Sequence, residues 1–193
     1  IGKVDTIAFD KTGTLTYGRL DVSDILSFDD SIDETKLLSL AASAEAKSEH
    51  PLGKAIVAYA KSKEAEITES ASFKMTTGKG IYAEVESFKL LCGNEKFLIE
   101  NRISIDRDIQ SVLDRLRAQG KASILVADEK KCLGVIALSD VLRPEAKDMV
   151  SRLAAMQTQV VLLTGDNKKT ANYFAHQAGI SQVRAELLPE EKV

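Results

Sequence analysis

The sequence predicts an α/β protein that contains an inserted antiparallel α+β domain. Two short apolar runs, 4–9 and 159–163, each end in a polar turn with a glycine, as buried strands of parallel sheets do. Helical spacing of apolar residues on both sides of the second run indicates the strand–helix alternation of such a sheet. Between the two runs, closely spaced strand candidates leave no room for crossover helices, so this middle part is expected to be antiparallel.

The parallel framework is supported by local signals along the chain. A strand over 4–9 comes first, and a helix over 149–156 leads into the second strand, 159–163. A further helix over 168–178 is predicted to end at Gly179, because glycine readily adopts the left-handed conformation that closes a helix.

The inserted part shows a different pattern. Its clearest element is an amphipathic helix over 106–119, with apolar residues on one face and Gly120 as its end. The other expected elements are helices over 33–47 and 53–63, strands over 72–77, 81–86 and 88–91, and a hairpin of strands 123–127 and 132–138. The boundaries divide the chain into a first framework segment, 1–17, the insert, 18–138, and a second framework segment, 139–193.

Composition excludes several classes of protein. A net charge of −3 argues against a strongly basic nucleic-acid-binding protein, and 44% hydrophobic residues argue against a disordered chain. Cys92 and Cys132 are far apart and form no Cys-x-x-Cys pair, so we expect two reduced thiols that fill the core. No apolar run approaches the roughly 20 residues of a membrane span. The abrupt start at Ile1 indicates a piece of a longer protein.

The segment from Asp10 to Thr16 carries the strongest chemical signal. An Asp at the carboxyl end of a parallel strand faces the crevice where such sheets bind ligands. The turn after it offers consecutive backbone amides suited to a phosphate, and Lys11 adds a cation. These groups suit covalent phosphoryl transfer with Asp10 as the nucleophile.

This segment, Asp10-Lys11-Thr12-Gly13-Thr14-Leu15-Thr16, resembles the phosphorylation motif of the P-type ATPases, cation pumps built on the haloacid dehalogenase fold. Thr164-Gly165-Asp166 resembles the second phosphate-site motif, and Lys192 in Leu-Pro-Glu-Glu-Lys resembles the lysine of the third. The resemblance implies a Rossmann-like phosphorylation domain, incomplete at its C-terminus, in two segments around a nucleotide-binding domain.

The resemblance also implies roles for these residues. Thr164 would donate a hydrogen bond to the phosphoryl group, Asp166 would lie near Mg²⁺ and the nucleotide, and Lys192 would neutralise the phosphate. Asp10, by its carboxylate, and Thr12, by its backbone carbonyl, would bind Mg²⁺. Haloacid dehalogenase phosphatases carry a second Asp at the position of Thr12, where it acts as the general acid and base. Without that base an aspartyl-phosphate should persist, as a pump requires.

The insert resembles the nucleotide-binding domain of the heavy-metal-transporting branch. The segment Ser48-Glu49-His50-Pro51-Leu52 is similar to the His-Pro signature of that branch, and a Gly-x-Gly turn follows in the insert. The residues that the resemblance assigns to ATP binding are Glu45, His50, Gly78, Gly80, Gly93 and Asn94. An imidazole can stack on or hydrogen-bond to adenine, and glycines let a backbone approach the phosphates.

The whole resemblance implies the ATP-binding and aspartyl-phosphorylation region of a heavy-metal-exporting P-type ATPase, at the cytoplasmic face of a membrane. Its ligands would be ATP, ADP and Mg²⁺, its partners the transmembrane and actuator domains of the pump, and its cargo a metal ion bound elsewhere, with no nucleic acid. The segments Arg143-Pro-Glu-Ala-Lys147 and Val183-Arg-Ala-Glu-Leu-Leu-Pro189 favour zinc, cadmium or cobalt over copper. The family's Gly-Asp-Gly-x-Asn-Asp segment is not among these residues, so nucleotide binding is expected to survive in this chain better than phosphorylation.

Two alternatives remain open from the sequence. A soluble phosphatase of the same superfamily would use the insert as a substrate cap and would hydrolyse phosphomonoesters. A non-catalytic nucleotide-binding module would bind ATP without forming a phosphoenzyme, and acid-stable labelling of Asp10 from γ-labelled ATP would separate it from the enzyme.

Overall fold

A computed structural model describes residues 4–192, with the side chains of all of these except Pro189 and Lys192. The chain divides into two compact units. The first contains residues 1–19, 114–121 and 140–193, and the second contains residues 20–113 and 122–139. The sequence placed the boundaries near residues 17 and 138, and it assigned residues 114–121 to the insert, whereas the structure groups them with the first unit.

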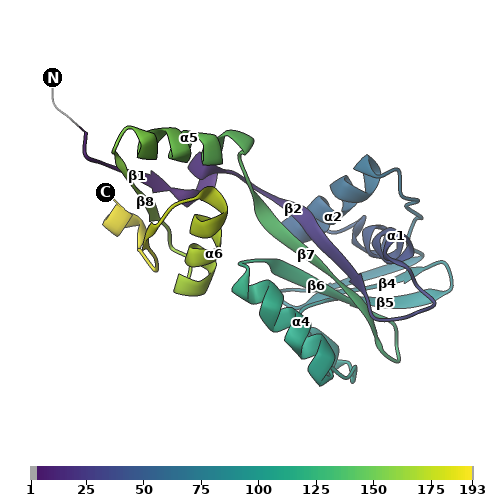
Figure 1. Ribbon diagram of the computed structural model, residues 1–193. Coiled ribbons are helices and arrows are strands. Elements are labelled where there is room, and N and C mark those ends of the chain that lie inside the picture. The colour runs from purple at the N-terminus through teal and green to yellow at the C-terminus, as the bar shows by residue number, and fades with distance from the viewer. Residues whose placement is uncertain (1–3, 193) are drawn as a thin grey trace. The chain divides into compact units, whose positions relative to one another are not determined.

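The first unit contains a three-stranded parallel sheet in the order β1-β8-β9 (Figure 1). Its strands are β1 (Thr6–Asp10), β8 (Gln159–Leu163) and β9 (Gln182–Arg184). Two helices, α5 (Pro144–Ala155) and α6 (Lys168–Ala178), share one apolar core with this sheet. In that core Val150 and Phe174 of the two helices meet Leu162 of β8. The parallel α/β framework expected from the sequence is therefore confirmed.

The second unit is built on a six-stranded sheet in the order β2-β7-β6-β5-β4-β3. The pairs from β3 to β7 are all antiparallel, which confirms the antiparallel character of the insert. The strands are β2 (Thr16–Ser27), β3 (Ser72–Thr76), β4 (Gly80–Val85), β5 (Phe88–Gly93), β6 (Ala122–Ala127) and β7 (Cys132–Leu142). Strands β2 and β7 extend past the limits of this unit, so they also carry the chain between the two units.

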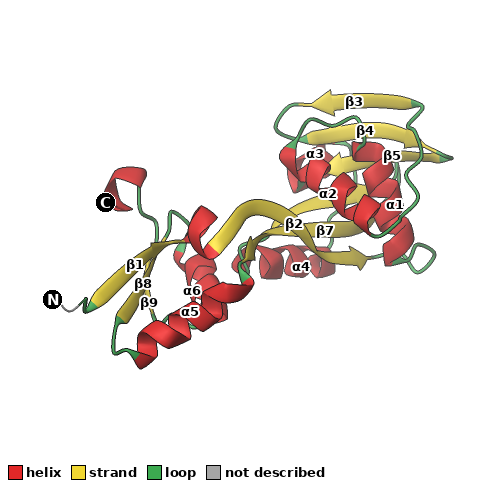
Figure 2. Ribbon diagram, turned by 90° about the horizontal axis from the view of Figure 1, so that it is seen from above, coloured by secondary structure: helices red, strands yellow, loops and turns green. Residues whose placement is uncertain are grey.

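Helices α1 (Glu34–Glu45) and α2 (Pro51–Ser62) cover one face of this sheet (Figure 2). Leu37 and Ile56 from these helices pack with Ile136 and Val126 of the sheet in one buried core. Helix α4 (Arg107–Ala118) is divided between the two units, since its residues from 114 onward are grouped with the first, and the short helix α3 (Glu95–Glu100) follows β5. None of the helices in residues 4–192 has the length and apolar character needed to cross a membrane.

Both cysteines are free and buried, as the sequence predicted. Burial raises the pKa of both thiols, and that of Cys132 reaches about 11. These thiols are therefore protonated at neutral pH and serve as packing groups.

Candidate functional site

The first candidate site lies at the carboxyl edge of the parallel sheet. Asp10 is the last residue of β1 and pairs in register with Leu163, the last residue of β8. Asp10 and Thr164 therefore leave adjacent parallel strands at the same edge, where open α/β sheets bind their ligands. The structure thus brings together the first and second motifs, which are more than 150 residues apart in sequence.

The loop after Asp10 has a bent backbone. Residues Lys11–Leu15 form a wide turn in which the amide of Thr16 donates to the carbonyl of Lys11. Gly13 at its centre has φ = +76°, a left-handed conformation that residues with a side chain adopt only at a cost. Its amide donates to Oγ1 of Thr16 at 3.3 Å, so this N–H is used within the loop. The sequence predicted a phosphate site made of consecutive free amides, and the Gly13 amide is therefore not free to take part in it.

Lys11 forms an ion pair within this site. Its Nζ lies 2.5 Å from Oδ2 of Asp166 and 4.5 Å from the centroid of the Phe174 ring. The side chain of Lys11 is only 11% exposed, and that of Asp166 is 30% exposed. Two of the residues expected at the site thus hold each other in place across the ends of the two strands.

The turn after β8 is held by further hydrogen bonds. Oγ1 of the buried Thr164 accepts from the amide of Asp166 at 3.1 Å, and the Thr164 carbonyl accepts from the amide of Leu187 at 3.1 Å. A Cβ on Gly165 would lie 3.2 Å from the Leu187 carbonyl oxygen, so a side chain there would crowd this loop. Lys192 lies in the short 3₁₀ helix η2 (Pro189–Lys192), and its side chain lies outside the described residues.

The donors at this edge are compatible with Mg²⁺. In proteins Mg²⁺ commonly takes one or two carboxylates and completes its octahedron with phosphate oxygens and water. The Asp10 carboxylate and the Thr12 carbonyl are oxygen donors from one loop and fit part of such a set. Within residues 4–192 as described, no cluster of three or more His, Cys, Asp or Glu could hold a metal by itself. Asp10 and Thr12 could thus supply only part of a Mg²⁺ ligand set.

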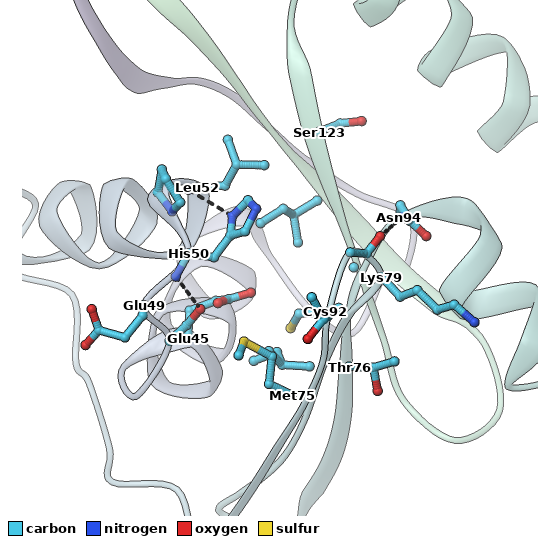
Figure 3. Close-up of a pocket in the computed structure, with 18 residues that line it drawn as sticks. Glu45, Glu49, His50, Leu52, Met75, Thr76, Lys79, Cys92, Asn94 and Ser123 are labelled. Atoms are coloured by element: carbon cyan, nitrogen blue, oxygen red, sulfur yellow. Dashed lines mark hydrogen bonds between the residues drawn. The ribbon is translucent and has the colours of Figure 1, made fainter.

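The second candidate site is a cavity of about 440 Å³ in the second unit (Figure 3). This volume is in the range of small-ligand sites. All six residues expected to bind nucleotide line it: Glu45, His50, Gly78, Gly80, Gly93 and Asn94. They come from α1, the start of α2, the β3–β4 turn and the end of β5, so the fold collects them from four places in the sequence. The apolar part of the wall includes Leu52, Met75, Ile81 and Ile124, which the sequence did not single out.

His50 is the N-cap residue of α2. Its Nδ1 accepts a hydrogen bond from the amide of Leu52 at 3.2 Å, shown as a dashed line in Figure 3. An Nδ1 that accepts cannot carry a proton, so this bond holds the ring in the tautomer with hydrogen on Nε2. The ring therefore offers its Nε2–H as a donor, from the exposed wall of the cavity.

Glu45 is a carboxyl group at the C-terminal end of α1 that lines the cavity, and only 4% of it is exposed. Burial raises the pKa of this carboxyl, and the hydrogen bond with Ser48 opposes the rise. A Cβ on Gly53 would collide with Oε2 of Glu45, so the glycine at this position leaves room for the carboxylate. Glu45 thus supplies a poorly solvated acceptor at the edge of an apolar cavity.

The glycines of the strand side have different roles. Gly78 has φ = +72° in the β3–β4 turn, with open space where a Cβ would be. Gly80 and Gly93 are paired in register on β4 and β5, and a Cβ on Gly80 would lie 2.7 Å from the Gly93 Cα. These two glycines allow close packing of the protein backbone, a reason that the sequence interpretation did not include.

Asn94 holds the glycine turn. Its Nδ2 donates to the Gly78 carbonyl at 3.0 Å, while its Oδ1 accepts from the amide of Phe97 at 2.9 Å as the N-cap of α3. Its backbone amide donates to the carbonyl of Lys79 at 2.9 Å. The side chain of Asn94 thus connects α3 to the turn that lines the cavity.

Comparison with known proteins identifies the family. The profile of the haloacid dehalogenase-like hydrolases matches residues 4–193. The chain belongs to this family. It is also 43% identical over 190 residues to a copper-exporting P-type ATPase of Staphylococcus aureus (strain bovine RF122 / ET3-1), covering 98% of the chain and 23% of that protein. The chain thus spans about a quarter of the length of the curated relatives that it matches.

Solved structures show the same relationship. A zinc-transporting PIB-type ATPase in the E2.Pi state superposes with a TM-score of 0.87 at 36% identity, over 98% of this chain and 30% of that one. The catalytic domain of the CPx-ATPase CopB-B, studied upon nucleotide binding, gives a TM-score of 0.65 at 28% identity, over 97% of this chain and 65% of that one. The resemblance to heavy-metal P-type ATPases is therefore confirmed for this member of the haloacid dehalogenase-like hydrolases. The preference for zinc, cadmium or cobalt over copper is not confirmed, because these relatives are named for copper and for zinc.

Proposed function

We propose that this chain is the ATP-binding and aspartyl-phosphorylation region of a heavy-metal-exporting P-type ATPase. The observation that carries the proposal is the cavity of the second unit, which is lined by all six residues expected to bind nucleotide. The relatives named above support the transport role, and their names support copper or zinc as the kind of ion.

In this proposal the cavity binds the adenine end of ATP. The apolar wall, including Leu52 and Ile81, excludes water from the faces of the base. The Nε2–H of His50 donates to an acceptor of the purine ring, and the Glu45 carboxylate accepts from an amino group. The turn at Gly78 has open space on its outer side, where the phosphates can approach the backbone.

Asp10 is the nucleophile of the proposed reaction. One of its carboxylate oxygens forms a bond to the γ-phosphorus of ATP, and the bond from that phosphorus to the β,γ-bridging oxygen breaks, so that ADP leaves. The oxygen of the Thr164 hydroxyl accepts from the amide of Asp166, so its hydrogen can be donated to a phosphoryl oxygen. Mg²⁺, bound through Asp10 and Thr12, would neutralise charge on the phosphates.

Persistence of the phosphoenzyme follows from the position of Thr12. The side chain of Thr12 is exposed and carries no group that could take a proton from water at neutral pH. The alternative of a soluble phosphatase requires a base at this place, and this chain has a hydroxyl. In a pump, the long-lived aspartyl-phosphate would couple ATP hydrolysis to export of the metal ion.

An ATP titration followed by ¹H–¹⁵N NMR tests the nucleotide site. Wild type should show saturable shifts at Glu45, His50, Gly78 and Gly80, while His50→Gln should lose them. His176→Gln is the matched control, since His176 is the other histidine of the chain and lies exposed on α6. Unmoved cavity residues in wild type, or equal affinity in the two histidine variants, would show that the adenine site is assigned wrongly.

Labelling with γ-³²P-ATP tests phosphoryl transfer separately. Acid-stable, hydroxylamine-sensitive label in wild type and none in Asp10→Asn is the expected result. Turnover of phosphomonoesters without accumulation of label would instead support the phosphatase. Saturable ATP binding without label would leave the chain a nucleotide-binding module.

A further inference from the structure

A cluster of polar groups surrounds the buried Thr16, at the end of the loop 11–16. Thr16 is fully buried, and its Oγ1 lies 2.5 Å from Oδ2 of Asp140, which belongs to β7 and is 124 residues later in the sequence. The same Oγ1 is 3.1 Å from the carbonyl oxygen of Lys11 and 3.3 Å from the amide nitrogen of Gly13. The first unit contains all four residues.

The direction of these hydrogen bonds follows from the single hydrogen of a hydroxyl. Thr16 can donate to only one acceptor at a time, and the short distance to the carboxylate of Asp140 marks the stronger, charge-assisted bond. The oxygen then accepts from the Gly13 amide. A chain of bonds thus runs from the amide of Gly13 through the Thr16 hydroxyl to Asp140, and each bond polarises the next.

Arg143 makes a second set of bonds to the same loop. Its backbone amide donates to the Leu15 carbonyl at 2.9 Å, Nε donates to the Thr16 carbonyl at 3.3 Å and Nη2 donates to the Gly13 carbonyl at 3.4 Å. Its guanidinium carbon also lies 4.8 Å from the ring centroid of Tyr17. Arg143 is held in turn as the N-cap residue of α5, ahead of a proline at the first helical position.

One detail argues for a function beyond stability. Oδ1 of Asp140 is buried and has no hydrogen-bond partner among the described residues. A desolvated carboxylate oxygen without a partner costs free energy in the folded state, while the other oxygen of the same carboxylate is bonded to Thr16. Departures of this kind from optimal stability are concentrated at functional sites.

We propose that Asp140 and Arg143 are positioning residues that hold the loop 11–16 in its bent form and so fix the direction in which Asp10 presents its carboxylate. This inference rests on the proposed phosphoryl transfer to Asp10. The physical reason is that in-line transfer depends on placement of the nucleophile, and displacements near 1 Å can cost about a hundredfold in rate. The bonds that Asp140 makes from β7 and Arg143 makes at the start of α5 limit the other conformations that this loop could adopt.

The test uses two pairs of variants. Thr16→Val removes the hydroxyl, and its control Thr16→Ser keeps it. Arg143→Lys changes the arginine at the start of α5, and its control Arg152→Lys makes the same change within α5. Amide hydrogen exchange of Gly13 measures the order of the loop, and exchange of Leu162 in β8 checks that the first unit is folded. We expect about tenfold faster exchange at Gly13 in Thr16→Val and Arg143→Lys, with Thr16→Ser and Arg152→Lys close to wild type.

Two functional measurements complete the test. ATP affinity, measured by the shifts of cavity residues, should stay within about twofold of wild type in all four variants, because the cavity belongs to the second unit. The initial rate of acid-stable labelling at saturating ATP should fall by about a hundredfold in Thr16→Val and recover in Thr16→Ser.

The outcomes separate this inference from the proposed function. Equal exchange at Gly13 in Thr16→Val and wild type would overturn the positioning role, as would faster exchange with an unchanged labelling rate. If wild type binds ATP but takes no label, phosphoryl transfer by this chain is the proposal that fails. The exchange data alone then decide whether the cluster orders the loop.

Discussion

Gly80→Ala should destabilise the second unit because two backbones meet at this residue. Gly80 of β4 pairs with Gly93 of β5, and an added Cβ would collide with the carbonyl oxygen of Cys92 and lie 2.7 Å from the Cα of Gly93. Neither atom belongs to a side chain that can rotate away, so the strands must separate. Overpacking of this kind costs about 3 kcal/mol in the free energy of unfolding.

Gly78→Ala is the matched control from the same turn. A Cβ there meets no atom within 4 Å, so only its left-handed φ of +72° opposes the change, at about 1–2 kcal/mol. Urea unfolding followed by circular dichroism, with amide exchange in β4 and β5 to identify the unit, measures both variants. An equal or larger cost for Gly78→Ala, or a cost below about 1 kcal/mol for Gly80→Ala, would refute the packing argument.

Three further predictions concern the same unit. Burial raises the pKa of Glu45, so between the ordinary glutamate pKa and this raised pKa the folded state holds more protons than the unfolded state. The free energy of unfolding should therefore fall as pH rises between these two pKa values. In urea titrations, Glu45→Gln should make this fall smaller and raise the free energy of unfolding at pH 7. Asn94→Asp keeps the oxygen that caps α3 but loses the donor to the Gly78 carbonyl. ATP affinity should therefore drop about tenfold, while the free energy of unfolding changes by less than about 1 kcal/mol. Equal ATP affinity in the variant and in wild type would show that the turn does not need the hydrogen bond from Asn94. Cys92 and Cys132 should resist a thiol reagent such as DTNB at pH 8 until the chain is unfolded, because burial raises both thiol pKa values; rapid labelling of the native chain would contradict this.

The elements that the sequence predicted most closely are those with strong local signals. Helix α6 has the bounds expected from its sequence because Asn167 caps its start, where Oδ1 accepts from the amide of Thr170, and Gly179 closes its end. Strand β8 was also predicted with its observed bounds, since a short apolar run between polar turns has few alternatives.

The elements that were missed lack a local signal. Strand β2 is 12 residues long but has mostly exposed or half-buried positions, so its alternation is weak, and it owes its extension to pairing with β7. The six-residue α3 and the three-residue β9 are too short to show a period. These elements depend on contacts with segments that are distant in sequence. Local sequence patterns do not reveal such contacts.

The residues of the two candidate sites also differ in whether a signal in the sequence indicated them. Residues of the cavity could be named in advance because the motifs around His50 and Gly78 resemble those of a known family, and the fold brings them together. No motif indicated that Asp140 and Arg143 contact the loop 11–16. Arg143 was noted only in a segment that was used to infer the metal, and the partners of both residues in this loop lie more than 120 residues earlier. Only the geometry shows that these residues contact the loop 11–16.

The two candidate sites lie in different units, and this separation predicts which measurement each substitution should change. Every residue that lines the cavity belongs to the second unit, whereas Asp10, Lys11, Thr164 and Asp166 belong to the first. Nucleotide affinity and phosphoryl transfer should therefore respond to different substitutions, each affecting its own measurement. A variant at the cavity that lowers ATP affinity should reach a normal labelling rate once ATP is saturating, and a variant at the loop should not, because no concentration of ATP restores the placement of Asp10.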